Sequence, residues 1–129
     1  MKRLPEAELE LMMIIWEADH PVSRAEIEEK MSGDKNVVPS TILTLLSRLE
    51  KRGFAQHKKE GKTNYYYAIA DKDAYLQEEG QSVLDRMFGS SLKNFVATLY
   101  GGKCLDENDI EELKQFIEEQ TGESGENEL

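Results

Sequence analysis

The chain has 129 residues, of which 39% are hydrophobic and 33% are charged, a composition suited to one small domain with an appendage. No apolar run approaches the roughly 18 residues of a membrane span, and the charged start lacks the apolar core of a signal peptide. The single cysteine, Cys104, excludes an intramolecular disulfide and predicts a reducing, cytoplasmic location.

The net charge of −10 is concentrated in the second half of the chain. Residues 71–129 carry 5 Lys/Arg and 15 Asp/Glu, whereas residues 35–68 carry 7 basic and 2 acidic residues. A basic middle followed by an acidic end is typical of a DNA-binding module joined to a second, acidic module. The negative charge of the acidic module repels it from the phosphates of DNA.

Two helices are predicted before the basic segment. The first begins near Pro5 and Glu6, and the His20-Pro21 dipeptide ends it. Ser23 and Glu26, three residues apart, form a capping box that starts the second helix. Four apolar residues of the first helix follow the i, i+3, i+4, i+7 spacing of an amphipathic helix: Leu9, Met12, Met13 and Trp16.

A third helix is predicted from Pro39, a favoured first-turn residue, to about residue 52, with Gly53 as its C-terminal cap. No carboxylate occurs before Glu50 in this helix, which suits it to a polyanion. Its buried stripe consists of Ile42, Leu45, Leu46 and Leu49. The opposite face carries hydroxyls and cations, namely Ser40, Thr41, Thr44, Ser47, Arg48 and Lys51.

A β-hairpin follows the third helix, with strands over 54–59 and 64–68 and a turn over 60–62. The aromatic run Tyr65–Tyr67 favours a strand, and Gly61 provides the positive φ that a tight turn requires. Lys58, Lys59 and Lys62 make the tip of this hairpin basic.

Three further amphipathic helices are predicted beyond Asp71. The last begins at Asp106, and its apolar residues are expected to point inward: Ile110, Leu113, Phe116 and Ile117. About sixty residues with this charge bury too little apolar surface to fold alone, so we predict that two copies pair. The predicted dimer interface consists of Val83, Leu84, Met87, Phe88, Leu92, Phe95, Val96, Leu99 and Tyr100. Packing of these residues on their own N-terminal domain is the alternative.

The order of elements predicts a mainly α fold with a small β-hairpin, a winged helix-turn-helix followed by a helical dimerisation region. The domains are then residues 1–70 for DNA binding, 71–120 for dimerisation, and 121–129 as a disordered acidic tail. The third helix fits a major groove about 12 Å wide. Base contacts are predicted for Thr41, Thr44 and Arg48, with Arg48 on a guanine. Backbone contacts are predicted for Ser40, Ser47 and Lys51 of the helix and for Lys58, Lys59 and Lys62 of the wing.

The chain resembles the penicillinase repressor family over residues 4–120. The motifs that carry the resemblance are Ala7-Glu8-Leu9-Glu10 and Ile15-Trp16; Thr41-Ile42, Thr44 and Arg48-Leu49; Lys59-Glu60-Gly61-Lys62 before Tyr65–Tyr67; and Leu84, Arg86, Leu92, Val96, Asp109-Ile110 and Glu112-Leu113. The resemblance implies a homodimeric bacterial repressor that binds a palindromic operator through its third helix, with the C-terminal helices joining the subunits.

The resemblance also bears on regulation. Some members of the family are inactivated when a regulatory protease cuts an Asn-Phe bond, which falls at Thr98-Leu99 in an ungapped alignment. An Asn94-Phe95 pair lies one helical turn earlier. Because the aligned bond differs, a response to β-lactams is not carried over. Copper-sensing relatives use paired Cys-x-Cys motifs, and Cys104 alone cannot form these.

Other functional classes have little support in the sequence. His20 and His57 are isolated, and no nucleophile–base pair or phosphate loop is visible, so we predict no enzyme, cofactor or metal site. Two alternatives stay open. One is a winged-helix adaptor that binds protein, and the other is a regulator that binds a small molecule between the two halves.

Overall fold

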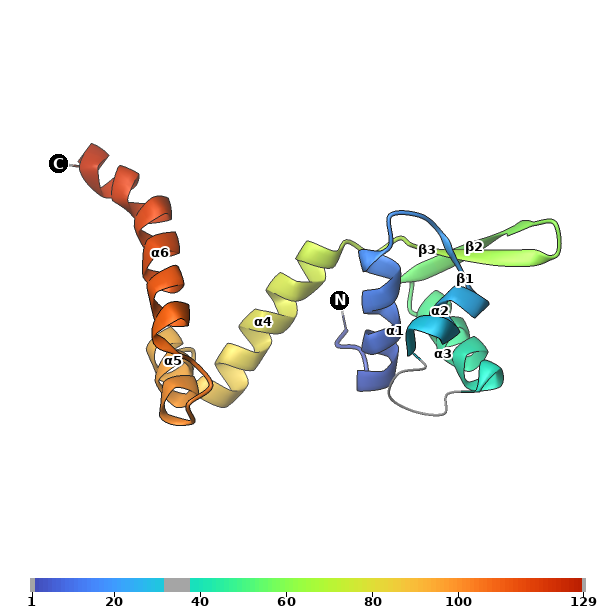
Figure 1. The fold of residues 1–129 in the computed structure, drawn as a ribbon, viewed down its shortest axis with the longest axis horizontal. Helices are drawn as coiled ribbons and strands as arrows, with labels where there is room; N and C mark the ends of the chain where they lie inside the picture. Colours follow the sequence, from blue (N-terminus) through green and yellow to red (C-terminus); the bar gives the residue numbers. More distant parts are fainter. Residues whose placement is uncertain (1, 32–37, 129) are drawn as a thin grey trace. The chain divides into compact units, whose positions relative to one another are not determined.

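The fold comes from a computed structural model that describes residues 2–31 and 38–128, with side-chain surroundings described as far as Gly122. Figure 1 shows nine elements in these residues: α1 (Glu6–Glu17), β1 (Val22–Ser23), α2 (Arg24–Met31), α3 (Pro39–Lys51), β2 (Ala55–Glu60), β3 (Thr63–Ala68), α4 (Lys72–Phe88), α5 (Leu92–Gly101) and α6 (Glu107–Glu128). The chain divides into two compact units, residues 1–79 and 80–129. The predicted mainly α class with a winged helix-turn-helix is confirmed.

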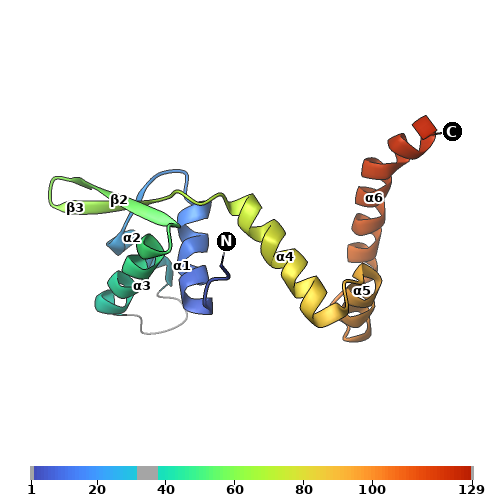
Figure 2. The same cartoon turned by 180° about the vertical axis from the view of Figure 1, so that it is seen from behind.

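The core of the first unit lies between its three helices and a small antiparallel sheet. Leu11, Ile27 and Leu46, one from each helix, are fully buried there. The sheet has the order β1-β3-β2, and Figure 2 shows the β2–β3 hairpin extending beyond the helices. The short strand β1, which places Val22 opposite Tyr66, was not predicted, because two residues are too few to show an alternating pattern.

The start of α4 belongs to the first unit. The Tyr75 hydroxyl accepts a hydrogen bond from the Leu4 amide at 2.9 Å, and the Tyr75 ring packs against Trp16 and Phe54. The Trp16 indole N–H donates to the Ala70 carbonyl at 2.9 Å. We predicted a boundary after residue 70, and the first unit instead extends to Glu79. The sequence pattern shows that Tyr75 is on an apolar stripe but not which core that stripe joins.

A buried ion pair fixes α1 against the end of α3. Glu8 is only 2% exposed, and its Oε1 accepts a hydrogen bond from Arg52 Nε at 2.7 Å. A buried carboxylate without such a partner would be strongly destabilising. The contact therefore holds the C-terminal end of α3 in a fixed position relative to α1.

Side-chain caps start α2, α5 and α6. The predicted capping box is confirmed in α2, where the Glu26 amide donates to Ser23 Oγ at 3.2 Å and the Ser23 amide donates to Glu26 Oε1 at 3.1 Å. Ser91 Oγ accepts from the Asn94 amide at the start of α5. Asp106 Oδ1 accepts from the Asp109 amide at 2.8 Å, as expected for the residue before α6.

The last helix runs into the segment 121–129, for which the sequence predicted a disordered acidic tail. In the structure α6 is assigned as far as Glu128. The Thr121 hydroxyl donates to the Ile117 carbonyl at 2.7 Å, and the segment contains no proline to interrupt the helix. Polar composition alone therefore did not decide the conformation of this segment.

Candidate nucleic-acid interface

The exposed side of α3 is organised around one polar stripe. Ser40, Thr44, Ser47 and Lys51 are spaced i, i+4, i+7 and i+11, which places them opposite the buried stripe. All four are exposed. The Thr44 hydroxyl donates to the Ser40 carbonyl at 2.9 Å, so its proton is engaged and its oxygen is left as an acceptor. An acceptor there is suited to the amino groups that adenine and cytosine present in the major groove.

The two flanks of this stripe differ in chemistry. Thr41 and Arg48, seven residues apart, share one flank, and both are exposed. Arg48 has no acidic partner within the described part of the chain, so its guanidinium is available to an outside acceptor. Leu43 and Glu50 share the other flank. The predicted contact residues thus occupy the stripe and one flank of α3.

The wing is held against α3 by a contact that sequence reasoning missed. His57 Nδ1 on β2 lies 2.6 Å from Glu50 Oε2 on α3, and the His57 ring packs against Tyr66 with centroids 5.3 Å apart. The sequence showed His57 only as an isolated histidine. Its pairing with Glu50 fixes the base of the hairpin, and no local sequence pattern signals a contact between a helix and a following strand.

The far end of the hairpin carries the predicted cations. Lys58 faces Tyr65 and Lys59 faces Asn64 across the β2–β3 pair, and Gly61 adopts φ +64° in the turn. Lys58, Lys59 and Lys62 are all exposed. The structure therefore places three lysines on one projecting hairpin next to the exposed side of α3.

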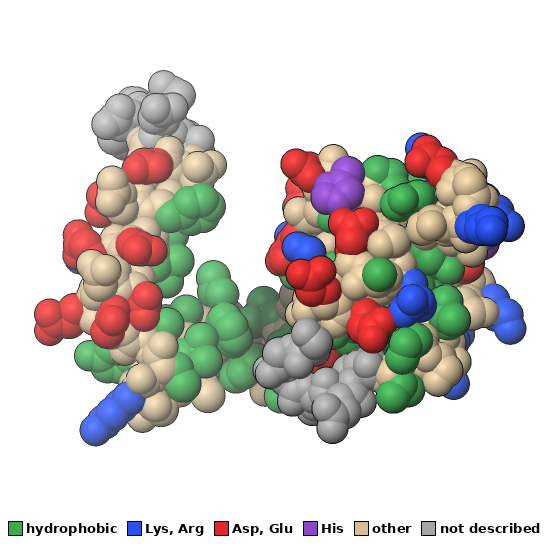
Figure 3. All heavy atoms as spheres, turned by 45° about the vertical axis from the view of Figure 1, so that its right-hand side comes forward, with side chains coloured by type: hydrophobic (Ala, Val, Ile, Leu, Met, Phe, Trp, Pro, Cys, Tyr) green, Lys and Arg blue, Asp and Glu red, His purple; other side chains and the backbone are tan. Residues whose placement is uncertain are grey.

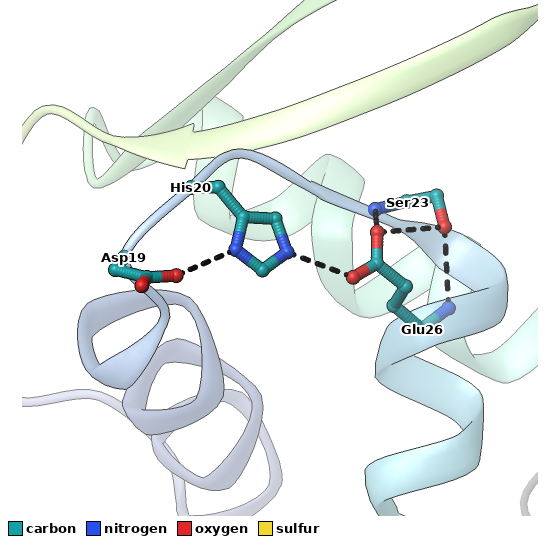
Figure 4. A network of polar contacts seen from close by, with 4 residues as sticks. All are labelled: Asp19, His20, Ser23 and Glu26. Carbon is teal, nitrogen blue, oxygen red and sulfur yellow. Dashed lines mark hydrogen bonds and ion pairs between the residues drawn. The ribbon is translucent and has the colours of Figure 1, made fainter.

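The turn between α1 and α2 contains a histidine between two carboxylates (Figure 4). His20 Nδ1 lies 2.7 Å from Asp19 Oδ1, and His20 Nε2 lies 2.9 Å from Glu26 Oε2. Hydrogen bonds to Glu26 and Asp19 raise the pKa of His20. The same contacts lower the pKa values of Asp19 and Glu26. Because Glu26 also caps α2, the network connects the turn to the start of that helix.

The second unit leaves its apolar residues uncovered. Among its described side chains, residues 80–122, none is buried. The nine predicted interface residues are half-buried or exposed, and the Phe88 and Phe95 rings contact each other at 5.0 Å. Figure 3 shows apolar side chains at the surface of the C-terminal helices.

The predicted inward orientation of the α6 apolar residues was wrong for the single chain. Leu113, Phe116 and Ile117 are exposed, and Phe116 is 59% accessible. The helical spacing was read correctly, but the described residues of this unit provide no layer that covers the stripe. Sequence periodicity identifies such a stripe without identifying its partner.

The residues of the predicted cleavage region and the single cysteine lie in α5 and just after it. Thr98 and Leu99 lie inside α5, and Asn94 and Phe95 lie near its start. Cys104 is an exposed free thiol after α5. In the described residues, no group of three His, Cys, Asp or Glu side chains is placed to hold a metal ion. No helix there is both long enough and apolar enough to span a bilayer.

Comparison with known proteins identifies the family. The family model described as "Penicillinase repressor" matches residues 4–119. The chain belongs to the penicillinase repressor family. The penicillinase repressor of Bacillus licheniformis is 33% identical over 122 residues, which cover 92% of this chain and 94% of that protein. The methicillin resistance regulatory protein MecI of Staphylococcus aureus (strain N315) is 29% identical and covers 86% of this chain and 89% of its own length.

A solved structure is similar to the first unit. The DNA-binding domain of the repressor BlaI is 35% identical, with a TM-score of 0.50, over 58% of this chain and 94% of that domain. Membership of the family makes this chain a DNA-binding transcriptional repressor and not an enzyme.

Proposed function

We propose that the protein is a homodimeric repressor that recognises a palindromic operator by inserting one α3 from each subunit into successive major grooves. The observation that carries this proposal is the exposed side of α3, where hydroxyls and cations are accessible and Glu50, the only carboxylate of the helix, is turned to His57. A helix with that surface can approach phosphate without charge repulsion and still present donors to base edges.

The proposed contacts are of two classes. Thr41, Thr44 and Arg48 contact base edges, and Arg48 has the reach and the paired donors for a guanine. Ser40, Ser47 and Lys51 contact the sugar–phosphate backbone beside them. The wing lysines Lys58, Lys59 and Lys62 contact the backbone farther along the duplex, where they contribute affinity but no base preference.

The second unit supplies the dimer. A unit with no buried residue among its described side chains cannot be stable through its own core. Pairing around a two-fold axis covers the apolar residues of α4, α5 and α6 and sets the two α3 helices at a fixed spacing. Of residues 71–120, the region predicted from the sequence, we propose that residues 80–120 form the dimerisation region, since the start of α4 packs in the first unit. Light scattering is expected to show twice the 14.8 kDa chain mass at micromolar concentration, and a clean monomer would contradict the dimer.

Sequence-specific DNA recognition is tested by comparing the affinities of two alanine variants for an operator that is selected from random duplexes. Arg48→Ala is expected to cost about 1–3 kcal/mol and to relax the preference at one base position in each half-site. Lys62→Ala is expected to weaken all sequences alike. It is also expected to make the dependence of the association constant on salt less steep. The magnitude of the slope of log association constant against log salt concentration should fall by about 1 for each phosphate that is no longer neutralised. Fluorescence anisotropy titrations at several salt concentrations provide both quantities.

Lys30→Ala is the matched control, because Lys30 is an exposed lysine at the end of α2 and away from the wing. It is expected to leave affinity and salt slope unchanged. Equal losses on every sequence for Arg48→Ala and Lys62→Ala would contradict the division into base and backbone contacts. Absence of any salt-dependent DNA retention would favour a protein-binding adaptor instead.

Release of the operator is proposed to require removal of α5. A regulatory protease that cut at Asn94-Phe95 would separate Phe95, Val96 and Leu99 from the DNA-binding unit. A cut at Thr98-Leu99 would separate Leu99, Tyr100 and α6 from it. A chain truncated after Asn94 is therefore expected to be monomeric and to release operator DNA. Retention of both the dimer and the operator by that truncated chain would contradict this route.

A further inference from the structure

One residue of α3 does not fit the polar character of its exposed side. Leu43 is 46% exposed and is the only large apolar side chain of α3, a fully described helix, that is not buried. It lies out of phase with the buried stripe and shares a flank of the helix with Glu50. Because Glu50 contacts the wing residue His57, this flank is the one nearest the hairpin.

Leu43 lines an open pocket of about 430 Å³. The other walls are Ser23 of β1, the first two residues of α2 (Arg24 and Ala25) and the wing from Lys62 to Tyr66. Leu43, Ala25 and Tyr65 contribute its apolar lining, and Lys62 contributes positive charge. The Arg24 guanidinium also lines the pocket, where it is paired with the Glu28 carboxylate one helical turn farther along α2. No carboxylate is among the described residues that line it. This combination fits an occupant that is anionic along one edge and apolar at one point.

We propose that Leu43 is a specificity-determining residue that packs against the C5-methyl group of one thymine in each operator half-site. The inference rests on the proposed function, since it places a DNA strand across the pocket between α2, α3 and the wing. The leucine side chain has no hydrogen-bonding group. The thymine methyl is the one apolar group among the features by which base pairs are distinguished in the major groove.

The position of the pocket favours DNA over other occupants. It adjoins the stripe of Ser40, Thr44 and Ser47, and its cations come from the start of α2 and from the wing rather than from one isolated patch. Lys62 on the wing attracts phosphate, so a strand whose phosphate meets the wing lysine would bring a neighbouring base edge toward Leu43. Contact with deoxyribose instead would show no dependence on the base.

The experiment replaces thymine by deoxyuridine, which removes only the methyl group. Each thymine of the selected operator is replaced in turn, in both half-sites together, and the affinity of the full-length protein is measured. Wild-type protein is expected to lose about fourfold per methyl group, hence about fifteenfold for the symmetric pair, at one position only. Leu43→Ala is expected to bind the thymine and deoxyuridine operators equally at that position.

Leu76→Ala is the matched control, because Leu76 on α4 is 43% exposed and does not line the pocket. It is expected to keep the wild-type preference for thymine. Thermal unfolding of both variants checks that each is folded.

Two results would overturn the proposal. One is a wild-type affinity that no replacement of thymine by deoxyuridine changes. This result does not depend on the folding of any variant. The other is a thymine preference that persists in Leu43→Ala. Failure to select any operator sequence would instead contradict the proposed function itself.

Discussion

The two units of the chain differ in where their apolar residues lie. All 14 buried apolar residues of the described chain belong to residues 1–79, and the described residues of 80–122 contain none. Helices with an apolar stripe occur in both units. The difference lies in what covers the apolar stripe. The first unit covers its stripe with its own second layer, whereas the described residues of the second unit leave theirs uncovered.

This comparison separates two kinds of stability. The first unit has a core, a buried ion pair and an aromatic cluster, so its folding is expected to be independent of concentration. In the proposed dimer the second unit gains stability from association, so its stability is expected to depend on concentration by mass action. Trp16 is the single tryptophan, and it packs between Phe54 and Tyr75. Its fluorescence therefore reports on the first unit alone.

The largest expected effect is in the first unit. Arg52→Ala leaves the Glu8 carboxylate buried without its partner, and is expected to lower the free energy of unfolding by about 3–5 kcal/mol. Urea unfolding followed by Trp16 fluorescence measures this change. Glu8→Ala removes the buried charge itself and leaves the half-exposed Arg52 to water, so its cost is expected to be smaller. A larger loss in Glu8→Ala than in Arg52→Ala would contradict an uncompensated carboxylate as the cause.

The second prediction concerns the uncovered stripe of α6. Phe116→Asp places a charge on the proposed dimer surface and is expected to weaken dimerisation at least about 100-fold, which is about 2.7 kcal/mol. Analytical ultracentrifugation measures the association. The unfolding curve of the first unit, read from Trp16, is expected to be unchanged. Gln115→Asp, on the neighbouring exposed position, is the matched charge control, and an equal loss there would mean that acidity and not the apolar contact is responsible.

Local rules account for what could be predicted from the sequence. The bounds of α3 follow from Pro39 and Gly53, the start of α2 from the Ser23–Glu26 capping box, and the hairpin turn from Gly61. Each of these signals lies within a few residues of the structure that it determines. The exposed polar side of α3 follows from helical spacing in the same way, so the candidate DNA-binding residues were accessible to sequence reasoning.

Contacts between distant residues account for what was missed. Glu8 and Arg52 are 44 residues apart, Leu4 and Tyr75 are 71 apart, and the Glu50–His57 pair joins a helix to a strand. None of these pairs produces a periodic pattern in the sequence. Leu43 could have been found, because an apolar residue out of phase with Ile42, Leu45 and Leu46 is visible in the spacing. Its pocket could not, since α2 and the wing form the other walls.

The smallest expected effect tests the polar turn of the first unit. Hydrogen bonds to Glu26 and Asp19 raise the pKa of His20 above its ordinary value of 6.5, so the folded state binds this proton more tightly than the unfolded state does. The resulting stabilisation is fully present below pH 6.5 and is lost as the pH rises through the raised value. The lowered pKa values of Asp19 and Glu26 give the opposite pH dependence. The stabilisation from these carboxylates is lost as the pH falls through their folded-state pKa values.

His20→Gln removes the titrating group while keeping a polar side chain. The thermal midpoint of wild-type protein, read from Trp16 fluorescence, is expected to fall relative to that of the variant as the pH rises from 6 toward 8. The change is expected to be small, because His20 and Asp19 are exposed and water screens the pair. The same dependence on pH in both proteins would mean that the carboxylates hold the imidazole no more tightly in the folded chain than water does in the unfolded one.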